Sequence, residues 1–89
     1  MQYLRKRKKD VPGSRVKAVQ ITSEWLGGNI PTEWFDTVTV LPTLSVIKVH
    51  DAFGLTVANE GDWVVRDSLG VIRWCRSDVF SQVYKRVED

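Results

Sequence analysis

Short stretches in which β-branched and aromatic residues alternate with polar ones recur along the chain. They lie at residues 15–21, 38–41, 46–50, 55–57, 63–66 and 71–75. Such alternation favours β-strands, because successive side chains of a strand point to opposite faces of a sheet. Turn-forming residues separate the stretches at Pro42, at residues 59–62 and at residues 67–70. The pattern therefore predicts several short antiparallel strands.

Signals for helices are brief. Pro31 can begin a single helical turn over residues 32–35, since its missing N–H is not needed there. Ser77 has the side chain of an N-cap residue, and positions 79, 80, 83 and 84 form an apolar stripe on a short helix. Residues 85–89 can add a final short strand. The predicted fold class is α+β: a small, mostly antiparallel β-sheet or partial barrel with one or two short helices.

The clearest larger unit is a hairpin formed by residues 63–66 and 71–75. A four-residue link at 67–70 places Val65 opposite Ile72 and Trp63 opposite Trp74. In this register the four apolar side chains share one face, and we expect that face to pack on the core.

Arginines gather on the other face of this predicted hairpin. Arg66 and Arg73 become diagonal neighbours, and Arg76 follows just before the helix start at Ser77. Arginine can bind a phosphate through two N–H groups at once, and a helix N-terminus adds backbone donors. The predicted ligand-binding residues are Arg66, Arg73, Arg76 and Ser77, with an exposed Trp25 or Trp34 stacking on a base. The alternative is a solvated face on which Arg66 and Arg73 pair with Asp62, Asp67 or Asp78.

Composition narrows the class of protein. A chain of 89 residues fits one domain, which we place at residues 15–89 after a basic arm and turn at residues 1–14. Its apolar content of 43% supports a core, and the net charge of +2 gives only a weak preference for anionic partners. The one cysteine, Cys75, excludes an intramolecular disulfide. Without a long apolar run we expect neither a membrane span nor a signal peptide, and a cytosolic location fits.

Residue types that support catalysis are scarce. His50 and Cys75 are each the single residue of their kind, too few for a usual metal site, so we predict no catalytic residue, metal or cofactor. Glu60 and Asp62 flank a turn whose amides they can bind. The basic run at residues 5–9 has no interleaved aromatic residue, so we do not expect sequence-specific nucleic-acid recognition.

Two segments together resemble a known group of proteins. The basic start is followed by KAVQI, and residues 61–84 read GDWVVRDSLGVIRWCRSDVFSQVY, with Pro-Thr-Leu at residues 42–44 between them. This ordered set resembles short proteins found in tailed bacteriophages and prophages, although Ile21 stands where that family has Trp and the segment after it is shorter. The resemblance implies a phage origin and a location in the host bacterial cytoplasm. It assigns no reaction.

These observations lead to three functional hypotheses. The first is a phage accessory protein, a small oligomeric binder that sequesters an anionic, nucleotide-type signal of host immunity. The second is a module that binds a host or phage protein through Trp25, Trp34 and Phe35. The third is a phosphodiester hydrolase that acts on such a signal with His50 or with the carboxylates of residues 60 and 62. We expect a binding protein rather than an enzyme.

The aromatic residues also predict a homo-oligomer. One core can hold Trp63, Trp74, Phe80 and Tyr84. Four other large aromatic residues lie in segments rich in Gly, Pro and Thr, where loops are expected. These residues are Trp25, Trp34, Phe35 and Phe53. A monomer would expose them as an apolar patch, and a two-fold dimer could bury that patch.

Overall fold

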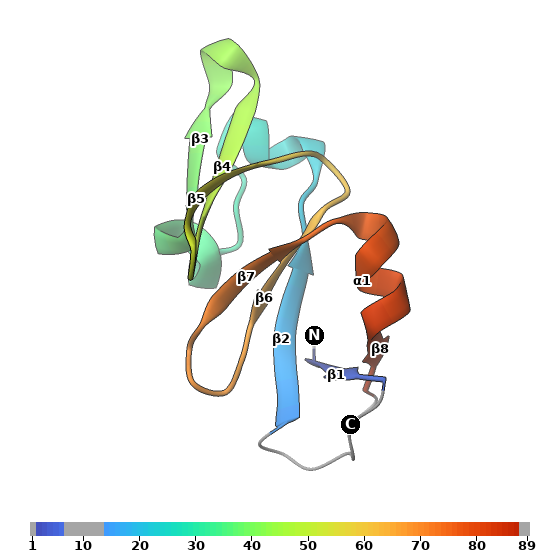
Figure 1. Cartoon of the computed structure of the whole chain (residues 1–89). Helices are drawn as coiled ribbons and strands as arrows, with labels where there is room; N and C mark the ends of the chain where they lie inside the picture. The colour runs from blue at the N-terminus through green and yellow to red at the C-terminus, as the bar shows by residue number, and fades with distance from the viewer. Residues whose placement is uncertain (1, 7–13, 88–89) are drawn as a thin grey trace.

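The computed structural model describes residues 2–6 and 14–87, and its strands form two antiparallel sheets. The large sheet has the strand order β7-β6-β2-β1-β8, and the small sheet has the order β3-β4-β5. Short 3-10 helices (η) and one α-helix connect them (Figure 1). The elements are β1 (Gln2–Arg5), β2 (Arg15–Gln20), η2 (Ser23–Gly27), η3 (Thr32–Thr37), β3 (Val38–Leu41), η4 (Pro42–Leu44), β4 (Val46–Asp51), β5 (Gly54–Ala58), β6 (Trp63–Arg66), β7 (Ile72–Cys75), α1 (Ser77–Val83) and β8 (Tyr84–Arg86).

The predicted fold class is confirmed in its coarse form: mostly antiparallel sheet with one short α-helix. The partial barrel is not found, because the two sheets remain separate. No helix in residues 2–6 and 14–87 is long and apolar enough to cross a membrane.

Strand β6 is buried on both of its faces. Val64 is 0% exposed and Val65 is 2% exposed, although neighbouring residues of a strand point in opposite directions. The small sheet lies on one side of β6 and α1 lies on the other (Figure 1). A strand with two buried faces needs a packed layer on each side, and the chain supplies both.

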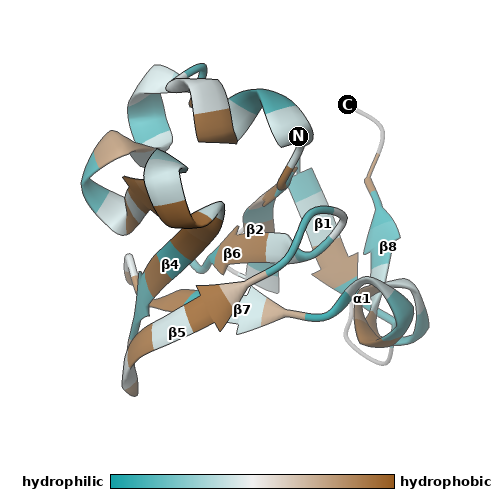
Figure 2. Ribbon diagram, turned by 90° about the horizontal axis from the view of Figure 1, so that it is seen from above, coloured by the Kyte–Doolittle hydropathy of each residue, from teal (hydrophilic) through white to brown (hydrophobic). Residues whose placement is uncertain are grey.

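The first hydrophobic cluster fills the space between the two sheets. Val64 meets the inward side chains of the small sheet, and Trp25 from η2 and Trp34 from η3 complete this core. Figure 2 shows the hydrophobic parts of β4, β6 and β7 lying toward one another in this layer. The buried residues of this cluster are Ile21, Trp25, Trp34, Val38, Ile47, Val49, Ala58 and Val64.

The second cluster lies under α1 and is mainly aromatic. The rings of Trp63 and Phe80 are stacked, with centroids 3.9 Å apart and an interplanar angle of 3°. Tyr3 meets both of these rings edge-on, and Tyr84 stacks on Phe80 at 5.1 Å. The prediction that Trp63, Trp74, Phe80 and Tyr84 share one core is therefore wrong, since Trp74 packs against the first cluster.

The chain start contributes a strand rather than only a basic arm. Strand β1 pairs with β2 on one side and with β8 on the other. Leu4 is 0% exposed and Tyr3 is 8% exposed, so both side chains belong to the core. Residues 1–14 were expected to form an arm and turn; residues 2–5 form β1 instead, and residues 1 and 7–13 of that stretch lie outside the described residues.

The predicted hairpin exists, but its register is shifted by one residue. Val64 lies opposite Trp74 and Arg66 lies opposite Ile72. The shift comes from Gly70, which has a φ of 83° and makes a bulge, so that Asp67 pairs with Val71 through an N–H···O bond of 3.1 Å. The sequence argument assumed one wet face, and β6 has none.

The predicted N-cap is also displaced by one residue. Helix α1 begins at Ser77, and Arg76 is its N-cap residue, whose carbonyl accepts the N–H of Phe80 at 2.8 Å. No side chain caps this end. Asp78 lies in the first turn as expected, where a carboxylate interacts favourably with the helix dipole.

We predict that Leu4→Ala destabilises the whole domain, because the side chain is fully buried in a strand that joins β2 to β8. The expected loss in the free energy of unfolding is about 2 to 5 kcal/mol, measured by urea denaturation. Lys6→Ala, at an exposed position just after β1, is the matched control and should have little effect. Equal stability of the Leu4 variant and wild type would show that β1 is not part of the cooperative fold.

Candidate functional site

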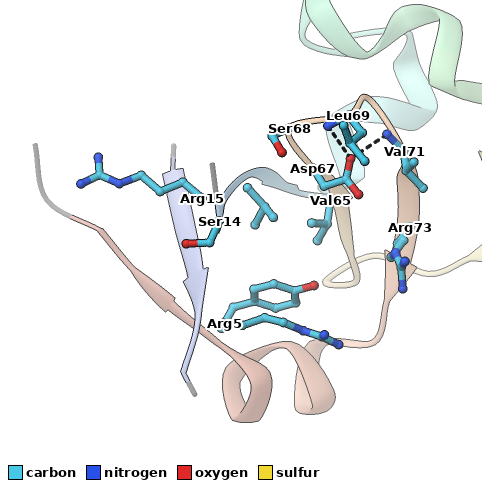
Figure 3. A pocket seen from close by; sticks show the side chains of 11 residues that line it. Arg5, Ser14, Arg15, Val65, Asp67, Ser68, Leu69, Val71 and Arg73 are labelled. Carbon is cyan, nitrogen blue, oxygen red and sulfur yellow. Dashed lines mark hydrogen bonds between the residues drawn. The ribbon is translucent and has the colours of Figure 1, made fainter. Parts of the chain in front are cut away.

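A cleft of about 210 Å³ opens on the large sheet between the start of β2 and the β6–β7 turn. Its lining combines apolar side chains with polar and charged ones, among them three arginines. Figure 3 shows Arg5 and Arg73 extending toward the same end of the cleft, whereas Arg15 extends away from it. The residues that line it are Arg5, Ser14, Arg15, Val16, Val65, Asp67, Ser68, Leu69, Val71, Arg73 and Tyr84.

Strand register brings Arg5 and Arg73 to the same face. Arg5 lies opposite Tyr84 in the β1–β8 pair, and Arg73 lies opposite Val65 in the β6–β7 pair. Directly paired residues share a face, and Val65 and Tyr84 both belong to the second cluster. Both arginines are exposed, and within the described residues neither makes an ion pair or side-chain hydrogen bond.

The opposite rim is a rigid turn built around Asp67. One oxygen of its carboxylate, Oδ1, accepts the backbone N–H of Leu69 and of Val71, each at 2.9 Å. The Gly70 N–H is bound by the Asp67 carbonyl at 3.0 Å, which closes the turn. Within the described residues this carboxylate forms no ion pair with Arg5 or Arg73, although it lines the same cleft.

The structure separates Arg66 from Arg73, which the sequence analysis placed together. Arg66 faces the first cluster, with its guanidinium carbon 4.7 Å from the centre of the Trp34 ring. Its Nη2 atom donates to the Glu33 carbonyl at 2.9 Å and lies 3.5 Å from Thr37 Oγ1. Arg66 therefore holds η3 against the large sheet, and the predicted Arg66–Arg73 pair is wrong because the bulge puts them on opposite faces.

The two predicted stacking residues are core residues. Trp25 and Trp34 are each only 2% exposed, so the prediction that either offers an open ring to a base is wrong. Their segments were expected to be loops with outward side chains. The 3-10 helices η2 and η3 turn both rings inward, onto the small sheet.

Arg76 and Ser77 lie beyond the cleft and do not line it. Arg76 forms an exposed ion pair with Asp78, with 3.5 Å between Nε and Oδ1. Among the described residues, neither Arg66 nor Arg73 forms the ion pair with Asp62, Asp67 or Asp78 that was the alternative expectation. Of the predicted ligand-binding residues, only Arg73 lines the cleft.

The residues of the hydrolase hypothesis are engaged in separate local contacts. The ring nitrogen Nε2 of His50 lies 2.6 Å from Thr39 Oγ1. The carboxylate of Asp62 is buried, and its Oδ2 accepts the Trp74 indole N–H and the Asn59 backbone N–H, each at 3.0 Å. That second bond confirms the turn role predicted for Asp62. In the part of the chain that the structure describes, no group of three or more His, Cys, Asp or Glu side chains is arranged to hold a metal ion.

Cys75 is half-buried beside Trp63 in the second cluster. Burial raises the pKa of its thiol above the usual value of 9.0, and the negative charges of Asp62 and Asp78 raise it further. A thiol in this state is a poor nucleophile at neutral pH, because the thiolate is the reactive form.

Sequence reasoning missed Arg5 and Tyr84 as parts of one site. Arg5 belongs to a basic run, which suggested a solvated arm. The signal that could have found it is the alternation of residues 3–5, which places Arg5 on the same face as Tyr3 once this segment is treated as a strand.

Comparison with protein-family models, with curated proteins and with solved structures found no match to this chain. The resemblance to short proteins of tailed bacteriophages therefore stays a prediction from the sequence motifs.

We predict that Cys75 reacts slowly with iodoacetamide while the protein is folded. The pKa of the Cys75 thiol is higher in the folded state than in the unfolded state. The protonated thiol therefore stabilises the folded protein fully at pH values below the unfolded pKa. This stabilisation is lost as the pH rises through the folded pKa. The alkylation rate of the folded protein should level off at a higher pH than that of the denatured protein, and at neutral pH it should be the slower of the two because less thiolate is present. Mass spectrometry of timed samples gives both rates. Equal rates for folded and denatured protein at neutral pH would contradict the assigned burial.

We predict that Asp67→Ala lowers the free energy of unfolding by about 1 to 2 kcal/mol, since two turn N–H groups lose their acceptor. Asp67→Asn is the matched control, because its amide oxygen can still accept these bonds and should retain most of the stability. Thermal unfolding followed by circular dichroism measures both variants. If the two variants lose stability equally, charge rather than hydrogen bonding governs the turn.

Proposed function

We propose that this protein binds a small anionic ligand of the nucleotide type in the cleft lined by Arg5 and Arg73. The observation that carries the proposal is the pair of arginines at one end of a cleft of mixed polar and apolar lining, neither of which forms an ion pair with a described carboxylate. Arginines beside apolar side chains in a concave site are suited to a ligand that carries a phosphate and a flat ring.

Each part of the cleft has a role in this binding mode. The planar guanidinium groups of Arg5 and Arg73 can each give two N–H donors to phosphate oxygens. Val16 and Val65 provide an apolar floor for a base or sugar, and Tyr84 adds an aromatic ring at the wall. The Asp67 turn is held by its own hydrogen bonds, so the rim is already formed before a ligand arrives.

The motif resemblance supports a biological setting for such a binder. A phage accessory protein that sequesters an anionic immune signal in the host cytoplasm needs binding without turnover, and arginines over an apolar floor are suited to binding. We propose that role for the chain, as a homo-oligomer. The burial argument for an oligomer now depends on Phe35 and Phe53, which are 53% and 90% exposed, and no longer on the two buried tryptophans.

The two alternative functions have less support. Of the three anchors proposed for a host-protein interaction, Trp25 and Trp34 are in the core and only Phe35 is exposed. The hydrolase would need His50 or the carboxylates of Glu60 and Asp62 in the cleft, and none of these residues lines it. His50 lies at Thr39 and Asp62 accepts the Trp74 indole N–H instead.

We predict that the wild-type protein binds a member of a panel of cyclic dinucleotides and ADP-ribose derivatives, and that Arg73→Gln weakens this binding by about tenfold to a hundredfold, the usual loss for a charged hydrogen bond. Isothermal titration calorimetry measures the affinities. Arg5→Gln should act in the same way. Arg76→Gln is the matched control, because Arg76 is exposed but pairs with Asp78 outside the cleft.

Two outcomes would contradict the proposal. One is the absence of heat for every ligand of the panel at high excess. The other is an equal loss of affinity in the Arg73 and Arg76 variants, which would indicate a general effect of positive charge. Chromatography of the ligand after incubation separates a binder, which returns it intact, from a hydrolase.

A further inference from the structure

Strand β5 forms an open edge of the small sheet. It pairs with β4 on one side, and the sheet ends there, since the strand order is β3-β4-β5. In an antiparallel strand every second residue turns its N–H and C=O away from the paired neighbour. Among the described residues, no backbone group outside the small sheet binds to Gly54–Ala58. This edge therefore offers hydrogen-bonding groups to another strand.

The side chains beside this edge are apolar and unusually exposed. Leu55 is 53% exposed and Val57 is 56% exposed, and both point to the outer face of the small sheet. Phe53, in the turn before the strand, is 90% exposed. Leu55 and Val57 alternate with Thr56 and Ala58, which are less exposed, so Leu55 and Val57 share the outer face of β5.

The strand also lacks the features that usually protect an edge. Its sequence is GLTVA, with no proline and no charged residue. In natural proteins, charged residues, prolines or bulges usually prevent an edge strand from pairing with another strand. The hairpin is firmly held, because Asp51 accepts the Phe53 N–H at 2.8 Å and the Thr56 hydroxyl at 3.1 Å, so the open edge is a fixed feature.

The apolar pattern of β5 is symmetric about Thr56, which identifies the occupant of this edge. If a second copy of β5 pairs antiparallel with the first about Thr56, Leu55 of each copy lies opposite Val57 of the other. All four of these side chains then share one face and cover one another. Gly54 lies opposite Ala58 in the same register, so no bulky side chain opposes them. A two-fold axis generates this arrangement from a single strand.

We propose that two copies of this chain associate through their β5 strands, which joins their small sheets into one continuous antiparallel sheet. The contact combines backbone hydrogen bonds along the edge with burial of Leu55 and Val57 of both copies. No residue of the small sheet lines the cleft at Arg5 and Arg73. Association through β5 therefore does not depend on the proposed ligand, and the two proposals can be tested separately.

Sedimentation equilibrium from low to high micromolar concentration tests the proposal. The wild-type chain should be a dimer at the upper end of this range. Val57→Lys and Leu55→Glu, which each place a charge opposite an apolar residue, should weaken association by at least about tenfold. The double variant with both changes should regain the dimer, because the new carboxylate at position 55 of each copy faces the new ammonium group at position 57 of the other. Val79→Lys, at an exposed position on α1, is the control and should remain a dimer.

A wild-type chain that stays monomeric over the whole range would overturn the proposal. So would a double variant that associates no better than the single ones, because the rescue depends on the Leu55–Val57 register. Far-ultraviolet circular dichroism of each variant confirms that it is folded, and the charge-rescue comparison keeps the test decisive if one single variant proves unstable.

Discussion

Two consecutive valines in the middle of β6 impose the architecture of this protein. Val64 and Val65 point to opposite faces of the large sheet, and both are almost completely buried. Each face therefore needs its own packed layer. The small sheet, with Trp25 and Trp34, covers the Val64 face, and α1 covers the Val65 face through Phe80. A chain of this length has few residues to spare, which is consistent with every Trp, Tyr and Phe except Phe35 and Phe53 packing in one of the two clusters.

The β6–β7 turn then decides what each arginine of the hairpin can do. Gly70 adopts a left-handed conformation and adds a bulge, which shifts the strand pairing by one residue. As a result, Arg66 is directed to the Trp34 ring and serves the core, whereas Arg73 is directed to the cleft. In the other register the two arginines would lie on one face, so the pairing register separates a structural arginine from a candidate ligand-binding one.

Strand positions could be predicted from the sequence because alternation and turn residues are local signals. The strands around Pro42, the turn before Asp62 and the short helix after Arg76 were all found in this way. The register of the hairpin could not be predicted, because the argument for it needs one solvated face and β6 is buried on both. The burial of Trp25 and Trp34 was missed for a related reason, since 3-10 turns rich in Gly and Pro resemble exposed loops.

For the candidate site, only Arg73 was predicted correctly as a lining residue; Arg5 depends on a strand pairing between distant segments, which local patterns do not reveal.

The register of the β6–β7 hairpin is the feature that most of these conclusions require, and nuclear magnetic resonance can measure it directly. In an antiparallel pair, the α-protons of residues in non-hydrogen-bonded positions lie closest to each other. The bond from the Asp67 N–H to the Val71 carbonyl fixes which positions these are. A nuclear Overhauser spectrum should therefore show contacts between the α-protons of Val64 and Trp74, and between those of Arg66 and Ile72. Contacts between the α-protons of Trp63 and Trp74, or of Val65 and Ile72, would contradict the register and would return Arg73 to the same face as Arg66.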